Sequence, residues 1–430
     1  MSENTAAQST NLRHRWFGFI QYADLKVALL YIIFIAFSIY TVTTASGSEM
    51  YEFFFRSGGG GGGLISPIVK HYIIVCFCAL IVMAMVAMPL KHADRIRSVL
   101  APLFFFASVG LLILQMCVGA TINEAARWVH IGGISIQPSE IFKLGVVLAL
   151  SLLSCLYQER KDMVRYPMRR YYYIPLLVIG GFVGYILYNN VSTGLIYAVA
   201  ISLLLFIYEM PLKRYIPIFG GGAMLAMLAF LWLATTDTVP QWGRLATAKS
   251  RIDKMLAPKE EGNFEIHDEN LQERFSQIAI ANANIRGRGL GKSQMKEVLP
   301  MAMSDYVYAV VIEETGIIGV VAIPSLYIAW FCLVLMLARR EKDKFFRYVL
   351  YGIGVFYPLQ ALVNIIVVSG LVTTGQPLPF LSAGGSSALS GSLAFGFMLM
   401  ISRWQTERQL ESNQTKEEEL EPSTDSPAIG

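Results

Sequence analysis

The sequence predicts an all-α polytopic membrane protein with about ten transmembrane helices. Hydrophobic residues make up 54% of the 430-residue chain, 15% of the residues are charged, and the mean hydropathy is +0.50. A soluble domain carries about a quarter charged residues. Apolar runs of about 20 residues, the length that crosses a bilayer as a helix, recur along the chain. These observations exclude an ordinary soluble enzyme.

Ten apolar runs are long enough to be spans. They lie near residues 24–45, 71–90, 98–118, 139–157, 172–188, 193–210, 215–235, 317–338, 347–369 and 386–402. The polar segment 1–22 lacks the apolar core and cleavage site of a secretory signal, so we expect the first span to be retained. The five cysteines show no metal-ligand spacing, and we expect them to be packing residues without disulfides.

Basic residues are concentrated in the short loops on one side of this predicted bundle. They precede the first span and follow the second, fourth, sixth and eighth spans, as with Arg15, Lys91, Arg169, Lys213 and Arg340. Positively charged loops remain in the cytoplasm, which predicts that both termini are cytoplasmic. The acidic segment 404–430 lacks apolar periodicity and is predicted to be a disordered tail.

This topology places three notable segments on the outer face of the membrane. The first contains six consecutive glycines, Gly58–Gly63, which predict a flexible linker without a site. The second is Gly119–Ser139. The third is the long loop 236–304 between the seventh and eighth spans, and loops of this length are usually functional or disordered.

Acidic residues stand where the long outer loop enters the eighth span. They are Asp305, Glu313 and Glu314. Acids at a membrane boundary are costly unless they face protein or water, which makes them functional candidates. The alternative is that Ser304 and Asp305 cap the following helix. The run from Asp305 to Ala338 is too long for one span, so Thr315-Gly316 is predicted to divide it. The stretch 306–314 would then form a short helix or re-entrant piece at the outer boundary, and Asp305, Glu313 and Glu314 would face a groove open to the outside.

A second polar group lies at the start of the fourth span. Pro138 favours a turn, Ser139 is predicted to cap the helix, and Glu140 and Lys143 share its first turn. With Arg127 nearby, this group suits an anionic lipid headgroup. The alternative is a structural ion pair at a helix end, with the lysine extending to the interface.

The last motif, Gly375–Gly391, combines two prolines with Gly384-Gly385-Ser386-Ser387 at the start of the tenth span. An open helix N-terminus can bind phosphate, and a capped glycine turn is the alternative. By contrast, GRGLGK over 287–292 follows no strand, and we reject a nucleotide site there. The histidines show no zinc-binding spacing.

Three stretches resemble motifs of the SEDS family (shape, elongation, division and sporulation proteins, including FtsW and RodA). RWVHIGGISIQPSEIFKL is similar to the family's motif around QPSE-x-x-KL. The family's (T/S)DFIFAVI-x-EE-x-G stretch resembles a second segment of this chain, LPMAMSDYVYAVVIEETG. The family's closing PLPF-x-S-x-GGSS motif resembles a third segment, GQPLPFLSAGGSSALS. The resemblance extends from about Tyr22 to Arg403, and we expect one transmembrane domain over 23–403.

The resemblance implies a peptidoglycan glycosyltransferase that polymerises lipid II, an undecaprenyl diphosphate-linked disaccharide peptide, at the outer face of the cytoplasmic membrane. It implies a class B penicillin-binding protein and other divisome proteins as partners, and no nucleic acid. Asp305 matches the essential acid and would be the general base. The positions expected to bind substrate are Arg127, Gln137, Ser139, Glu140, Lys143, Ser386 and Ser387, with Glu313 and Glu314 in support. A divalent cation (Mg²⁺ or Mn²⁺) is left open as a cofactor.

The chain departs from the family pattern in three places. Pro300-Met301-Ala302 lacks the family's glutamate, Asn189–Gly194 replaces an acidic motif, and Ala383 stands at an often aromatic position. The chain length, the charged tail and the residues of the motifs favour the division (FtsW-like) branch of the family. An elongation-type polymerase, a lipid II flippase and a non-catalytic scaffold are the alternatives.

Overall fold

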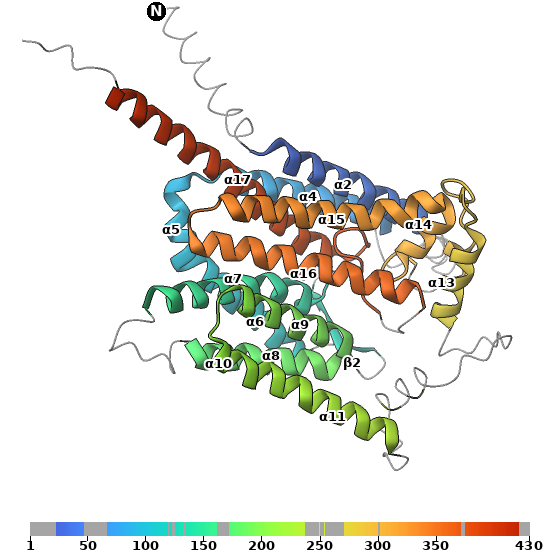
Figure 1. Cartoon of the computed structure of the whole chain (residues 1–430). Coiled ribbons are helices and arrows are strands. Elements are labelled where there is room, and N and C mark those ends of the chain that lie inside the picture. The colour runs from blue at the N-terminus through green and yellow to red at the C-terminus, as the bar shows by residue number, and fades with distance from the viewer. Residues whose placement is uncertain are drawn as a thin grey trace, which may run out of the picture.

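In the computed structural model the chain forms a bundle of long helices that run side by side (Figure 1). The structure describes residues 23–46, 67–118, 120–122, 125–131, 134–160, 172–236, 249, 253, 271–299, 302–370 and 375–420. Within these ranges, eight helices are long and apolar enough to cross a membrane, and two further apolar helices are shorter. The predicted multi-pass helical fold is therefore confirmed. The glycine run Gly58–Gly63 lies outside the described residues.

The apolar helices follow the predicted order. They are α2 (Leu25–Ala45), α4 (Pro67–Val86), a composite helix of η2 (Leu90–His92), α5 (Ala93–Arg95), η3 (Ile96–Leu100) and α6 (Ala101–Val118), then α7 (Pro138–Arg160), α8 (Ile174–Asn189), α9 (Val191–Ile207), a second composite of α10 (Leu212–Tyr215), η5 (Ile216–Gly220) and α11 (Gly221–Thr235), α15 (Ile317–Arg340), α16 (Lys344–Val368) and α17 (Gly385–Leu420). The shorter helices α13 (Leu271–Asn282), η6 (Met295–Glu297) and α14 (Val307–Thr315) belong to the long loop and its return to the bundle.

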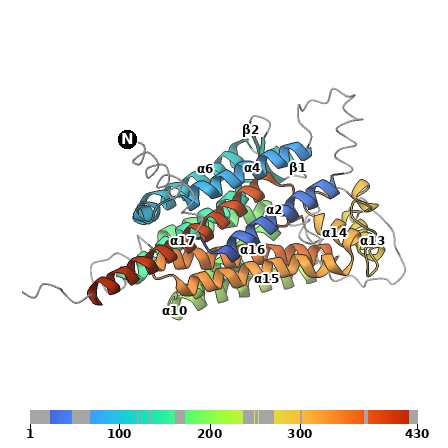
Figure 2. The same ribbon diagram turned by 90° about the horizontal axis from the view of Figure 1, so that it is seen from above.

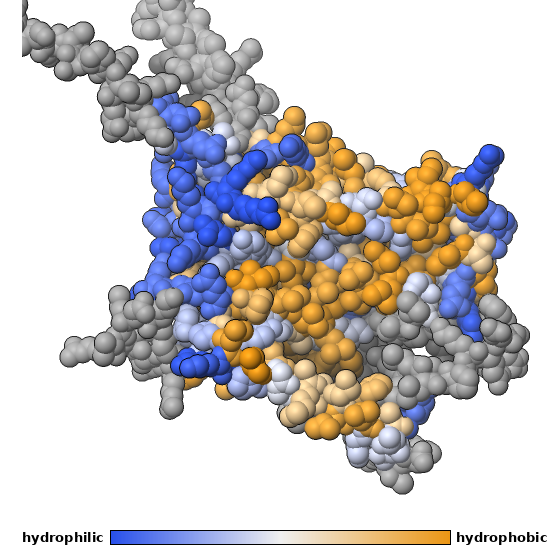
Figure 3. All heavy atoms as spheres, viewed as in Figure 1, coloured by the Kyte–Doolittle hydropathy of each residue, from blue (hydrophilic) through white to orange (hydrophobic). Residues whose placement is uncertain are grey.

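The two ends of the bundle differ in charge. One end, which we call the basic end, carries α5, α10 and the last turn of α15, and it forms the hydrophilic edge in Figure 3. There Arg97 lies 3.9 Å from the carboxylates of both Glu159, at the end of α7, and Asp343, before α16. The opposite end, which we call the site end, carries the β-strands, α13 and α14. Of the segments predicted to be basic, the described ones after the second, sixth and eighth spans lie together at the basic end.

Helix α7 lies at the centre of the bundle. In its most apolar stretch 78% of the residues are buried, compared with 83% for α17 and 6% for the composite helix that contains α11. Close packing around α7 depends on small residues. A Cβ added at Gly145 would lie 2.3 Å from Ser108 Oγ of α6, and one at Gly352 of α16 would lie 2.3 Å from Val147 Cγ1. Such distances are below van der Waals contact, so glycine sets the spacing of α16 from α7.

Aromatic rings join the other helices at the core. Phe34 of α2 packs edge-on against Tyr327 and Trp330 of α15, with ring centroids 5.4 and 5.3 Å away. It also contacts Phe380, in the loop before α17, at 5.7 Å. Edge-to-face packing of this kind favours one arrangement of the rings. The loop that enters α17 is thereby fixed to the core.

The eighth span is divided as predicted. Helix α14 ends at Thr315, and α15 begins at Ile317 after Gly316, whose φ is +62°. A Cβ at Gly316 would lie 2.4 Å from the carbonyl oxygen of Ile285. The break therefore requires glycine for its dihedral angle and for its close contact with the preceding loop. The predicted cap is wrong, because α14 starts at Val307 after Tyr306 and has no side-chain cap.

A small antiparallel sheet lies between α6 and α7, in a segment predicted only as a loop. Its strands are β1 (Ala120–Ile122), β2 (Ala125–Ile131) and β3 (Ile134–Ile136), in the order β1-β2-β3. Trp128 pairs with Ala120, and Val129 pairs with Ile136. The β-branched residues of this segment suit strands. Strand β3 leads directly into α7 and so positions the first turn of that helix.

The predicted disordered tail is wrong for residues 404–420, because α17 continues through Leu420 and extends beyond the bundle (Figure 2). Polar contacts support this extension. Arg403 pairs with Glu407 one turn later at 2.5 Å, and Arg408 pairs with the buried Glu341 at 2.5 Å. Trp404 Nε1 donates to the carbonyl oxygen of Met88 at 2.9 Å. Residues 421–430 lie outside the described residues.

Gly352→Ala is expected to destabilise the protein, because the added methyl group overlaps Val147 and forces α16 away from α7. Overpacking of this kind costs about 1–3 kcal/mol. The matched control is Gly180→Ala in α8, where an added Cβ has no atom within 4 Å. The measurement is the free energy of unfolding in a denaturing-detergent titration. Equal stability of the two variants would contradict the close approach of α7 and α16.

Candidate active site

The site end contains a buried ion pair on the first turn of α7. Lys143 Nζ lies 2.9 Å from Glu140 Oε2, and the two side chains are 2% and 3% exposed. Their spacing of three residues places them on one helix face. Lys143 does not extend to the membrane interface, so that part of the alternative interpretation is wrong. The ion pair itself is present as that interpretation expected.

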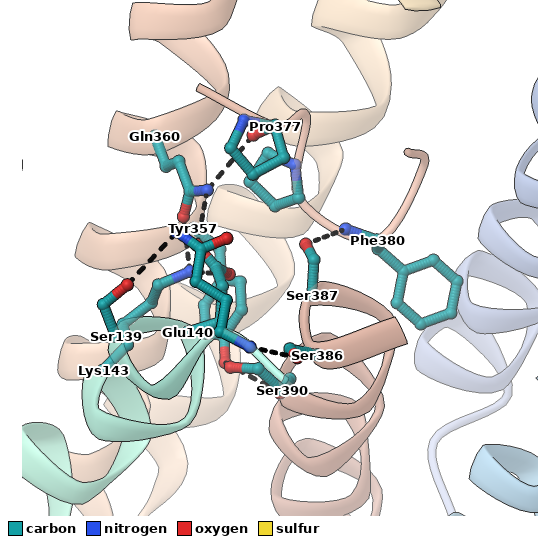
Figure 4. A network of polar contacts seen from close by, with 12 residues as sticks. Ser139, Glu140, Lys143, Tyr357, Gln360, Pro377, Phe380, Ser386, Ser387 and Ser390 are labelled. Carbon is teal, nitrogen blue, oxygen red and sulfur yellow. Dashed lines mark hydrogen bonds and ion pairs between the residues drawn. The ribbon is translucent and has the colours of Figure 1, made fainter. Parts of the chain in front are cut away.

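Two residues of α16 complete the surroundings of this pair (Figure 4). Lys143 donates to Gln360 Oε1 and lies over the ring of Tyr357, 4.7 Å from its centroid. The Gln360 amide donates to Glu140 Oε1 and to the carbonyl oxygen of Pro377, each at 3.1 Å. Both amide hydrogens of Gln360 are thus used. A buried charge pair is stable only when its remaining polar groups are also satisfied, and this network meets that condition.

Asp305 is connected to the same helix one turn further along. Asn364 Nδ2 donates to the carbonyl oxygen of Asp305 at 2.8 Å and to that of Gln376 at 2.6 Å. Two carbonyl acceptors fix which end of the Asn364 amide carries the nitrogen. Asp305 is half-buried, and a Cβ at Gly375 would lie 2.5 Å from its Oδ2. Glycine at 375 therefore leaves room for the carboxylate.

Tyr357, Gln360 and Asn364 form one polar row along α16, which sequence reasoning missed. They are three and four residues apart, the spacing of a single helix face. The signal was present in the sequence, since two amide side chains in an apolar span are unusual and need partners. The row joins α7, the turn at Asp305 and the loop 375–384.

The serines at the start of α17 are buried and hydrogen-bonded. Ser386 Oγ accepts from the backbone N–H of Gln137 at 2.9 Å, and Ser387 Oγ accepts from that of Phe380 at 3.3 Å. Ser139 is not a cap, because α7 already begins at Pro138. Its carbonyl accepts from Tyr197, and its hydroxyl accepts from the Gln137 amide at 3.2 Å. These contacts hold α7, α9 and α17 together.

Glu313 and Glu314 do not face an open groove, which corrects the prediction for both. They are 0% and 1% exposed. Glu313 accepts from Ser293 Oγ at 2.5 Å and from the backbone N–H groups of Gln294 and Met295 at 3.2 Å. Glu314 accepts from the Tyr40 hydroxyl at 2.9 Å. The sequence did not reveal the loop that covers them.

The glycine-rich segment 287–292 packs against the break between α14 and α15. The N–H groups of Arg288 and Gly289 donate to the carbonyl oxygens of Glu313 and Glu314, both at 2.9 Å. Gly287 has φ +73°, and a Cβ there would lie 2.2 Å from the Glu314 oxygen. The rejection of a nucleotide site is consistent with this structural role. The segment fixes the C-terminal end of α14, the helix that follows Asp305.

Arg127 lies on β2, and the position of its side chain is outside the described residues. The Asn189–Gly194 segment, which departs from the family motif, joins α8 to α9. Asn190 caps α9, and Thr193 Oγ1 accepts from Gln376 Nε2 at 2.7 Å. This segment therefore contacts the closing loop through a hydroxyl group.

The described residues form no cluster of three protein ligands for Mg²⁺ or Mn²⁺, although Mg²⁺ is usually held by only one or two carboxylates together with substrate phosphates. Among the described residues, no three His, Cys, Asp or Glu side chains gather closely enough to hold a metal ion. Glu140 is already paired with Lys143. We therefore derive no step through a metal ion.

The fold and these polar contacts define a class: a multi-pass helical membrane protein with a charged, buried network near one end of its bundle. Comparison with known proteins identifies the family. The family model described as cell cycle protein, of the FtsW, RodA and SpoVE type, matches residues 23–407. The chain belongs to this family.

Individual relatives and structures agree with that assignment. The chain is 31% identical over 346 residues to the probable peptidoglycan glycosyltransferase FtsW of Enterococcus hirae, covering 77% of this chain and 84% of the relative. It is 31% identical to the protein of the same description from Nitrosococcus halophilus, covering 70% and 75%.

Solved structures show the same fold. A chain from a peptidoglycan synthase complex, described as coordinating polymerization and crosslinking, aligns with TM-score 0.65 at 21% identity, covering 89% of this chain and 98% of that one. The rod shape determining protein RodA of Thermus thermophilus aligns with TM-score 0.58 at 20% identity, covering 89% and 97%.

Lys143→Met is expected to destabilise the protein by about 3–5 kcal/mol, because it leaves the Glu140 carboxylate buried without its cation. Glu140→Gln combined with Lys143→Met removes both charges and should recover most of that loss. The measurement is the free energy of unfolding for the wild type, both single variants and the double variant. Additive losses in the double variant would show that the two charges do not depend on each other.

Glu313→Ala is expected to release the loop 287–299, because the loop loses a buried acceptor for three donors. Peptides containing Gln294 and Met295 should exchange amide hydrogens faster in hydrogen–deuterium exchange. Glu297→Ala is the control, since Glu297 lies on the same loop and is exposed. Unchanged exchange in Glu313→Ala would contradict the anchoring role.

Proposed function

We propose that the chain is a peptidoglycan glycosyltransferase that polymerises lipid II into glycan strands, with a role in septal wall synthesis. Family membership and the FtsW relatives at 31% identity support this proposal. The observation that carries the chemistry is the setting of Asp305. It is half-buried, whereas the side chains of Glu140, Glu313 and Glu314 are buried. Among these motif acids, Asp305 is the one placed to meet a substrate.

The proposed reaction is a single displacement. The acceptor sugar hydroxyl loses its proton to the Asp305 carboxylate as its oxygen attacks the anomeric carbon of the second substrate. The bond between that carbon and the lipid diphosphate breaks, and the diphosphate leaves with the electron pair. Attack from the opposite face inverts the anomeric centre, converting an α-linked diphosphate into a β-linked glycan.

The buried network has a positioning role in this proposal. Lys143 and Glu140 hold the Gln360 amide, which donates to the carbonyl of Pro377. Asn364 donates to the carbonyls of Gln376 and Asp305. The carboxylate is thus placed by backbone contacts made from α16. Catalytic groups supported in this way keep their geometry during the reaction. We assign the stabilisation of the departing diphosphate's negative charge to Arg127, on strand β2.

The topology and partners follow from the same assignment. With the basic end in the cytoplasm, both termini are cytoplasmic and the site end faces outward. The product is an uncrosslinked strand, so a class B penicillin-binding protein acting as transpeptidase is the proposed partner, with other divisome proteins. This agrees with the similarity to a chain of a peptidoglycan synthase complex.

Asp305→Asn is expected to lower glycan formation by at least roughly a hundredfold, because the amide cannot accept the proton. Labelled lipid II is incubated with purified protein, with and without a class B penicillin-binding protein, and polymer is separated by gel electrophoresis. Lipid II binding by the variant should remain near that of the wild type. Glu297→Gln, an exposed acid on the same outer loop, is the matched control.

Two outcomes would overturn the proposal. Polymer formed at the wild-type rate by Asp305→Asn would remove this residue as the base. A wild-type protein that makes no polymer with its partner, yet moves labelled lipid II across liposome membranes, would be a transporter.

A further inference from the structure

A second polar site lies at the basic end, far along the bundle from Asp305. A cavity of about 320 Å³ opens between the last turn of α15 and the extension of α17. Three cations line it: Arg340, Lys342 and Arg408. Its remaining lining is uncharged and polar, formed by Gln405, Gln409, Ser412 and Asn413. Among the described residues no acidic side chain lines the cavity, so its chemistry suits an anion that also accepts hydrogen bonds.

Three acidic groups close to the cavity are paired with cations, two of them with the lining residues Arg408 and Arg340. Glu341 is 1% exposed, and its carboxylate accepts from Arg408 at 2.5 Å and from Gln405 at 3.0 Å. Glu407 pairs with Arg403 at 2.5 Å. Asp24 lies 3.8 Å from Arg340, whose side chain is 57% exposed. Within the described residues Lys342 forms no ion pair, so positive charge remains at the cavity.

The end of α15 does not repel an anion from this cavity. A helix C-terminus carries partial negative charge on its free carbonyl groups. Here the carbonyl of Leu337 accepts from Gln405 Nε2 at 2.9 Å. The carbonyl of Glu341 accepts from Arg347 Nε at 2.9 Å and from its Nη2 at 2.6 Å. These contacts neutralise the helix end.

An apolar ridge on α15 leads into the cavity. Ile328, Cys332, Met336 and Arg340 follow one another at four-residue steps, which places them along one helix face. Ile328 is 63% exposed, Met336 is 37% exposed, and Cys332 is exposed. At 1.5 Å per residue the ridge is about 18 Å long, close to the roughly 15 Å depth of one leaflet.

We propose that this cavity binds the phosphate of an anionic phospholipid whose acyl chain lies along the α15 ridge. Arg340 and Lys342 supply charge at the headgroup, and Ser412 and Asn413 supply hydrogen bonds. A free phosphate would use the cavity without the ridge, and an acidic peptide would not need an apolar path of one-leaflet length. The continuous polar and apolar parts therefore favour a lipid.

The test uses the purified full-length chain and native mass spectrometry, with phosphatidylglycerol or phosphatidylcholine added. Wild type should retain phosphatidylglycerol in preference to phosphatidylcholine. Arg340→Gln combined with Lys342→Gln should bind phosphatidylglycerol roughly thirtyfold more weakly, from about 1 kcal/mol for each cation near a lipid surface. The matched control combines Arg339→Gln with Lys344→Gln, which removes two exposed charges from the same segment outside the cavity.

Two arms separate the lipid from other anions. An excess of inorganic phosphate, or of an acidic peptide, should leave phosphatidylglycerol bound. Met336→Asp should weaken the binding of phosphatidylglycerol, because it interrupts the apolar ridge while the three cations remain. Equal lipid retention by the cavity variant and the control would overturn the site. Displacement of the lipid by inorganic phosphate or by the peptide would overturn the assignment to a phospholipid.

Discussion

The structure of the site end depends on one constraint: the charges of Lys143 and Glu140 are buried inside a bundle that is otherwise apolar. Each charge is stable there only beside the other and with its remaining hydrogen bonds made. Gln360 supplies those bonds from α16, and its second amide hydrogen reaches the carbonyl of Pro377. The pair therefore fixes the distance between α7 and α16 and the position of the loop 375–384. Gly352 permits the same approach through its lack of a side chain.

Two separate sets of contacts hold the segment that carries Asp305. On one side, Asn364 holds its backbone to α16. On the other, α14 is fixed by the glycine-rich segment and by the buried Glu313 and Glu314. The two supports come from distant parts of the sequence. A half-buried carboxylate on a short turn would otherwise have considerable freedom, and the two supports together limit it.

Much of this arrangement could be predicted from the sequence, because it follows from length and charge. The spans, the basic end and the break at Thr315-Gly316 each rest on one local pattern. What could not be predicted depends on contacts between distant residues. Glu313 and Glu314 read as open to solvent, since their cover comes from residues 287–299 and from Tyr40 of α2. Gln360 and Asn364 carried a signal as amides within a span, but their partners lie on α7 and in loops. The extension of α17 is supported by the ion pair between Arg408 and Glu341, the residue that follows α15. The acidic composition of residues 404–430 did not indicate this contact.

Helix α17 starts with Ser386 and Ser387 at the site end and continues through 36 residues to Leu420 beyond the basic end. At 1.5 Å per residue this is about 54 Å of unbroken helix. Such a rod transmits an axial push or a rotation with little loss over its length. One continuous helix backbone therefore connects the outer turns at the basic end with the two serines that hold Gln137 and Phe380.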